Sequence, residues 1–171
     1  AEKPRHYNGD GPIDSKDIVA PQYESDPKIR SLTIEKLAGS YPGYRDQPLI
    51  LIAPTVGKML PMRDYPKEHY VAVIRELLKR HPQHLFVLVG TEGHKGVAEY
   101  VRTEVANERC INFSGRTASV QELLELFLLG DLLISNDSGN VHFAAMADLR
   151  CLALFGPETP FMYGPLGRAV C

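Results

Sequence analysis

The 171-residue chain lacks the features that mark several classes of protein. It has no apolar run of about 18 residues, the length of a membrane-spanning helix, and its first ten residues, AEKPRHYNGD, lack the apolar core of a signal peptide. Its three cysteines, Cys110, Cys151 and Cys171, are odd in number and far apart, so they indicate neither a disulfide framework nor a metal-binding CxxC pair. We therefore expect a soluble protein of a reducing, cytoplasmic compartment.

An excess of positive charge is also missing. The chain has 19 Lys and Arg against 21 Asp and Glu, a formal net charge of -2. A surface for nucleic acid or anionic lipid usually carries a basic excess, so neither partner is favoured. The glycine motif GxGxxG is absent as well. GKMLPM stands after the first apolar run, where this motif would be expected, and its absence argues against a dinucleotide-dependent dehydrogenase.

The sequence changes character near residue 48. Residues 1–47 are rich in Pro, Gly, Asp and Lys, and only Lys28 to Leu37 suggests a helix, so we predict a linker or interdomain arm without a core of its own. Residues 48–171 are predicted to form one domain. Because the chain stops at Cys171 directly after a loop, we expect a fragment cut at both ends.

Within residues 48–171, short apolar runs alternate with segments of helical periodicity. This order requires parallel pairing through crossover helices and predicts an α/β fold with a doubly wound, Rossmann-like sheet. Ligands bind such sheets at the carboxyl ends of the strands, so each loop after a strand is a candidate site. The strands are expected at 49–54, 85–90, 110–115, 132–137 and 151–156, the helices at 67–81, 94–106, 119–131 and 138–148, and a loop broken by Pro and Gly at 157–167. Ser119 is predicted as an N-cap that forms a capping box with Glu122 three residues later.

The segment from Leu132 to Pro160 is the most informative for chemistry. A strand ends at Asp137, and Ser138 and Gly139 begin a helix whose unpaired N–H groups and dipole suit a diphosphate. His142 lies one helical turn beyond Ser138, so it is expected to face the same pocket and donate to a phosphate oxygen. The alternative is an ordinary helix cap with a partly buried histidine.

The stretches SNDSGNVHFAAMA and FGPETP resemble the signature of glycosyltransferase family 9, the heptosyltransferase family. In that family a D-[ST]-G-x-x-H-x-A-A helix start precedes a strand that ends in F-G-P-T-x-P. The resemblance covers roughly residues 48–168. It implies the C-terminal, donor-binding domain of a two-domain GT-B enzyme that transfers a sugar, heptose from ADP-heptose, to a lipopolysaccharide-type or other glycan acceptor.

The same resemblance suggests further donor contacts. Thr55 falls in the loop after the first strand, and the family's K-x-W-P element is replaced by RDYP, so that Arg63 or Lys58 would hold the diphosphate. Either cation can instead be a solvated surface residue. Glu92 is the nearby carboxylate for the donor's ribose, and Thr117 lies in a loop that would border the base.

The resemblance also implies what the chain does not supply. The catalytic base and the acceptor site belong to the family's N-terminal domain, so the isolated chain should bind donor without turning it over. No metal or cofactor is expected, and the full protein would work in the cytoplasm or at the inner face of the cytoplasmic membrane. Two alternatives stay open: a nucleotide-sugar epimerase-like enzyme, and a non-catalytic module that binds a nucleotide sugar.

Overall fold

The apolar strands are buried on both sides of a central sheet. In a computed structural model that describes residues 21–57, 60–166 and 169–170, successive residues of β1 (Leu49–Ala53) alternate between two separate cores. Leu49 and Leu51 belong to one core, while Ile50 and Ile52 belong to the other. Because side chains in a strand alternate between faces, a run of apolar residues is what a sheet covered on both sides needs.

The sheet is parallel, and in the described part of the chain it has six strands in the order β3-β2-β1-β4-β5-β6. The order runs outward in both directions from the β1–β4 pair, so the topological switch point lies between these two strands. The remaining strands are β2 (Leu85–Leu88), β3 (Cys110–Asn112), β4 (Gly130–Asn136), β5 (Cys151–Leu154) and β6 (Ala169–Val170). The predicted doubly wound α/β fold is confirmed.

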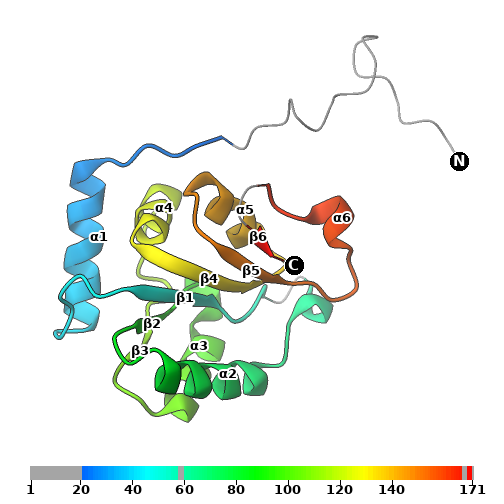
Figure 1. Cartoon of the computed structure of the whole chain (residues 1–171), viewed down its shortest axis with the longest axis horizontal. Helices are drawn as coiled ribbons and strands as arrows, with labels where there is room; N and C mark the ends of the chain where they lie inside the picture. Colours follow the sequence, from blue (N-terminus) through cyan, green and yellow to red (C-terminus); the bar gives the residue numbers. More distant parts are fainter. Residues whose placement is uncertain (1–20, 58–59, 167–168, 171) are drawn as a thin grey trace, which may run out of the picture.

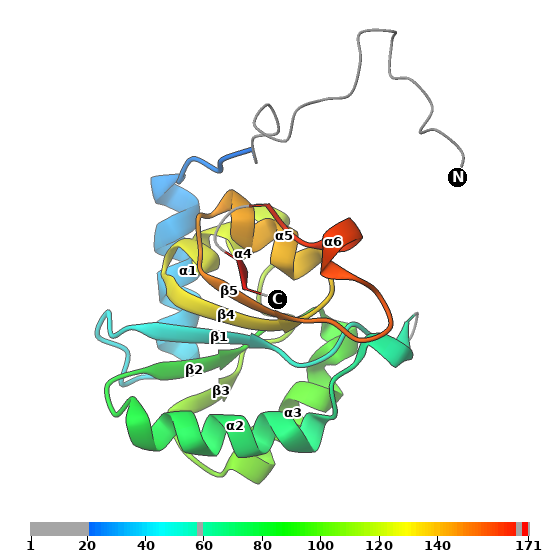
Figure 2. The same ribbon diagram turned by 45° about the vertical axis from the view of Figure 1, so that its right-hand side comes forward.

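Helices cover both faces of the sheet. Figures 1 and 2 show α2 (Lys67–Arg80) and α3 (Lys95–Val105) on one face, and α4 (Val120–Leu128) and α5 (Gly139–Met146) on the other. On α4, Ser119 is the N-cap as predicted, and its hydroxyl accepts a hydrogen bond from the Glu122 N–H at 3.2 Å. The expected capping box is only half formed, because the Glu122 carboxylate accepts from the Ala118 N–H instead of reaching back to Ser119.

The helix suggested at Lys28 to Leu37 is present as α1 (Pro27–Ser40). Asp26 caps it, accepting hydrogen bonds from two first-turn N–H groups, and α1 packs beside α4 with Leu37 fully buried in the core (Figure 1). This part of the expected linker therefore packs against the sheet domain. The domain boundary at residue 48 itself stays a prediction.

Two elements were not predicted. The short strand β6 extends the sheet beyond β5, which was expected to be the last strand, and the short helix α6 (Pro160–Tyr163) lies in a segment expected to be an irregular loop. Elements of two to four residues have no readable periodicity, so a sequence pattern misses them. Two 3-10 turns complete the fold, at Pro61–Arg63 and Glu92–His94. No helix among the described residues has the length and hydropathy needed to cross a membrane.

Candidate nucleotide-sugar site

A cleft of about 520 Å³ lies at the carboxyl ends of the central strands. Its walls come from the loops after β1, β2 and β3, from the first turns of α4, and from the loop between β4 and α5 together with α5 itself. This is where the Rossmann-like topology places a ligand. The lining residues are Thr55, Val56, Gly90, Thr91, Glu92, His94, Gly115, Thr117, Ala118, Ser119, Val120, Leu123, Ser138, Gly139, Asn140 and Phe143.

Helix α5 begins at the cleft. Ser138 is its N-cap in an extended conformation, and its hydroxyl accepts a long hydrogen bond, 3.4 Å, from the Asn140 N–H. Gly139 is exposed, and a Cβ there would meet only the Phe143 ring, at 3.8 Å. The backbone at Gly139 therefore has open space beside it, at the positive end of the helix dipole. An anion such as a diphosphate has room to approach this backbone.

The loop after β1 is tied to the end of β4 by buried polar groups. Asp64 accepts hydrogen bonds from the Thr55 hydroxyl at 2.9 Å and from the Val56 N–H at 2.7 Å. On β4, Asn136 Oδ1 accepts from the Tyr65 N–H and from the Tyr70 hydroxyl, both at 3.0 Å. These contacts hold the loop after β1 against the end of β4, the two strands on either side of the switch point.

Burial raises the pKa of the Tyr70 hydroxyl, and the Asp64 charge raises it further, so this group stays a neutral donor to Asn136. The hydroxyl of Thr55 is likewise engaged, since it donates to Asp64 and accepts from the Gly57 N–H at 3.0 Å. Thr55 thus shapes the loop that lines the cleft, and its predicted contact with a donor stays a prediction.

Arg63 and Asp137 form a separate ionic group that does not line the cleft. Arg63 Nη1 lies 3.0 Å from Asp137 Oδ2, and Nη2 lies 3.1 Å from Glu158 Oε1. Asp137 is only 3% exposed, and no donor among the described residues makes a well-aligned hydrogen bond to its Oδ2. The buried carboxylate therefore depends on the Arg63 charge for compensation.

The wall formed by the loops after β2 and β3 contains a residue that the sequence reasoning missed. A Cβ on Gly57 would lie 2.8 Å from His94 Nε2, and a Cβ on Gly90 would lie 2.8 Å from His94 Cβ. The two glycines thus leave room for the His94 side chain, whose Nδ1 is buried without a hydrogen-bond partner among the described residues. The sequence does carry a signal, one glycine in each of two loops. This signal indicates His94 only when the folded structure brings the two loops together.

Glu92 and Gly115 meet on the same wall. Gly115 has φ +75°, and its missing side chain leaves the space that the Glu92 carboxylate occupies. Glu92 is exposed and pairs with Lys95 at 3.2 Å, so its second carboxylate oxygen can accept hydrogen bonds from a ligand's hydroxyls. Thr117, Leu123 and Phe143 continue the cleft past this point.

The structure thus brings together five predicted donor contacts and places three others outside the cleft. The five that line the cleft are Thr55, Glu92, Thr117, Ser138 and Gly139. His142 is exposed and does not line the cleft, contrary to the expectation that it faces the same pocket as Ser138. The helical i, i+4 relation does not hold from Ser138, because this N-cap residue is extended, and Asn140 and Phe143 face the cleft instead. Lys58 lies outside the described residues, and Arg63 and Asp137 pair with each other.

Comparison with known proteins identifies a family and curated relatives that are heptosyltransferases. The profile of glycosyltransferase family 9 (heptosyltransferase) matches residues 15–171. Among curated proteins, the lipooligosaccharide heptosyltransferase 2 of Haemophilus influenzae is 26% identical over 152 residues, which cover 87% of this chain and 43% of that protein. The chain therefore spans less than half the length of this relative.

Solved structures show the same fold. The E. coli ADP-heptose LPS heptosyltransferase II superposes with a TM-score of 0.75 at 23% identity, covering 88% of this chain and 44% of that one. A family 9 glycosyltransferase from Veillonella parvula gives 0.76 at 24% identity, covering 87% and 42%. The fold is also similar to that of a UDP-GlcNAc 2-epimerase from Methanocaldococcus jannaschii, with a TM-score of 0.57 at 15% identity over 85% of this chain and 38% of that one.

Proposed function

Because the chain belongs to glycosyltransferase family 9, we propose that it is the donor-binding part of an enzyme that transfers heptose from ADP-heptose to a lipopolysaccharide-type glycan. One observation carries the proposal. Five residues predicted as donor contacts from the sequence lie on four separate segments of the chain, and all five line one cleft at the topological switch point.

The cleft offers complementary groups for the parts of such a donor. The start of α5 at Ser138 and Gly139 presents N–H groups and a positive dipole end to the diphosphate. We propose that Glu92 accepts from ribose hydroxyls, and that a flat base packs against the apolar side chains of Leu123 and Phe143, which line the cleft together with Thr117. The proposed donor would therefore lie across the ends of β4, β1, β2 and β3.

The chemistry proposed for these residues is stabilisation of the leaving group. When the bond between sugar and diphosphate breaks, negative charge grows on the diphosphate, and oriented N–H groups that are already in place lower the energy of that state. Arg63 is less suited to this role than a free cation, since two carboxylates already neutralise it. His142 is exposed on α5 and does not line the cleft, so its contact with a phosphate stays a prediction.

The rest of the reaction requires residues outside this chain. We propose that the base that deprotonates the acceptor hydroxyl, and the acceptor site itself, lie in the other half of the enzyme, and that this chain alone binds donor without turnover. We also propose that the full enzyme works in the cytoplasm or at the inner face of the cytoplasmic membrane.

Titration calorimetry with ADP, UDP and GDP, in buffer containing EDTA, tests the proposal. We expect ADP to bind most tightly. Gly139→Val should weaken ADP binding by at least about tenfold, because a branched side chain at the helix start blocks the approach of a phosphate. Gly96→Val is the matched control, since Gly96 is also an exposed glycine in a first helical turn with open space around it, but on α3 and outside the cleft.

Three results would contradict the proposal. If the chain binds none of the nucleotides, or if Gly139→Val binds ADP as tightly as the wild type, the cleft is not the donor site. A clear preference for UDP would favour the epimerase-like alternative, whose test is epimerisation of a UDP-sugar by the full-length protein without any acceptor.

A further inference from the structure

Helix α4 turns two buried carboxylates toward α1. Glu122 is 6% exposed and Glu125 is fully buried, and they lie one helical turn apart. A buried carboxylate is costly unless charged or hydrogen-bonding groups compensate it. The compensating groups here come from α1, from the segment before it and from the loop that precedes α4.

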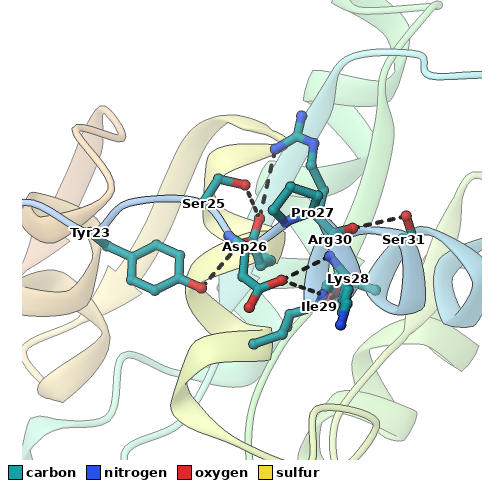
Figure 3. A network of polar contacts seen from close by, with 10 residues as sticks. Tyr23, Ser25, Asp26, Pro27, Lys28, Ile29, Arg30 and Ser31 are labelled. Carbon is teal, nitrogen blue, oxygen red and sulfur yellow. Dashed lines mark hydrogen bonds and ion pairs between the residues drawn. The ribbon is translucent and has the colours of Figure 1, made fainter.

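Glu125 holds the chain that leads into α1. Figure 3 shows Tyr23, Ser25 and Arg30 of that chain around Asp26. Its carboxylate accepts hydrogen bonds from the Tyr23 hydroxyl at 3.0 Å, the Ser25 hydroxyl at 2.9 Å and the Asp26 N–H at 2.7 Å. Arg30 Nη1 lies 3.8 Å from the same group. These contacts fix the first turn of α1 against α4.

Glu122 connects α1 to the cleft. Its Oε2 accepts from Lys36 Nζ at 2.7 Å and from the Ala118 N–H at 2.8 Å. Lys36 Nζ also donates to the Arg116 carbonyl at 3.3 Å. One ammonium on α1 thus contacts both the carboxylate on α4 and the backbone of the loop between β3 and α4.

That loop is a wall of the cleft. Thr117, Ala118 and Ser119 line it, and they lie between the end of β3 and the start of α4, outside any helix or strand. Burial raises the pKa of the Glu122 carboxyl, but the hydrogen bonds from Lys36 and the Ala118 N–H outweigh this and hold the pKa below its usual value. The ionised carboxylate is therefore the state that anchors the loop.

We propose that Lys36, through Glu122 and the Arg116 carbonyl, is a positioning residue that fixes the β3–α4 wall of the cleft from the outer helix α1. Removing the ammonium would loosen residues 116–119 while α1 stays attached through Glu125. The role of Lys36 in holding the loop is inferred from the contacts alone. Only the expected effect on nucleotide affinity rests on the proposed function.

Hydrogen exchange of the backbone amides in the 171-residue chain tests the geometry without any ligand. In Lys36→Met we expect the amides of residues 117–120 to exchange on the order of tenfold faster, as for the loss of one charge-assisted hydrogen bond, with β1 and β4 unchanged. Lys36→Arg should restore most of the protection, because it keeps the charge and the donors. Lys28→Met, an exposed lysine in the first turn of the same helix, is the control and should leave the loop unchanged.

The ADP titration then serves as the second readout. We expect Lys36→Met to weaken ADP binding by roughly threefold to tenfold, because a mobile wall must be ordered when the ligand binds. Lys36→Arg should restore the affinity. Unchanged exchange at residues 117–120 would overturn the inference, and so would an equal loss of protection throughout the domain. If the wild-type chain binds no nucleotide, the proposed function fails, while the exchange experiment still decides whether Lys36 positions the wall.

Discussion

At the scale of single residues, a charged side chain that is already paired within the protein is less available to bind a ligand. Arg63 stands in the place of a lysine that the family resemblance assigns to the diphosphate, yet its guanidinium lies between the carboxylates of Asp137 and Glu158. Asp137 has much less solvent contact than Glu158, whose side chain is 36% exposed. The ion pair with Asp137 is therefore the one whose loss leaves a charge without compensation.

This asymmetry predicts unequal effects of two substitutions. Arg63→Met should lower the free energy of unfolding by about 2–3 kcal/mol, since it leaves the Asp137 carboxylate buried alone. Asp137→Asn should lower the free energy of unfolding by less, because Arg63 keeps its ion pair with Glu158. Urea denaturation of both variants and of the double variant measures the coupling. Equal losses in the two single variants would contradict this account of the pair.

At the scale of elements, a helix start performs two tasks in this fold. Ser119 caps α4 and Ser138 caps α5, and both caps lie at the cleft. A cap satisfies an N–H that has no partner within the helix, so it stabilises the first turn. At α5 the same geometry leaves neighbouring amides facing the proposed ligand, while at α4 it sets where the wall of the cleft ends.

Removing the cap of α4 should have a measurable effect on stability. Ser119→Ala is expected to lower the free energy of unfolding by about 1 kcal/mol, because the Glu122 N–H loses its acceptor. For a domain of this size the melting temperature would fall by roughly 2–4 °C. Ser31→Ala is the comparison, since that hydroxyl donates to the Pro27 carbonyl within α1 and caps nothing. A melting temperature for Ser119→Ala equal to that of Ser31→Ala would refute the capping role.

At the scale of the whole molecule, the attachment of α1 depends on ionised groups on α4. The pKa of Glu122 in the folded protein is lower than its ordinary value, with burial opposing the shift and Lys36 and the Ala118 N–H outweighing it. A depressed carboxyl pKa stabilises the fold above the unfolded-state pKa, about 4.3 for glutamate, and that stabilisation is lost as the pH falls through the folded-state value.

Glu122→Gln should therefore have an effect that depends on pH. We expect it to lower the free energy of unfolding by about 1–2 kcal/mol at pH 7, and the difference from wild type to shrink as the pH drops below about 4. Glu76→Gln is the control on the exposed face of α2, where solvent screens the pairs with Arg80 and Lys79 and the substitution should have a much smaller effect. Denaturant unfolding at several pH values measures both, and a difference that stays constant with pH would rule out the ionised state as the source.

Local patterns in the sequence determined the succession of strands and helices and the helix starts at Ser119 and Ser138. They did so because burial on both faces makes a strand apolar throughout, and because a cap needs a particular side chain at one position. The family signature, carried by contiguous residues around Asp137, also required nothing beyond the sequence.

Contacts between residues distant along the chain were decided only by the tertiary structure. The sequence places Lys36 86 positions before Glu122, and Arg63 95 positions before Glu158, so no local period reports either pair. The space for His94 exists because Gly57 and Gly90 come from two loops that meet at the end of the sheet. The prediction for His142 assumed helical geometry at Ser138, whose backbone is extended, so helical spacing does not relate the directions of these two side chains. Such arrangements follow from the packing of the sheet and its helices, and packing is a property of the folded chain as a whole.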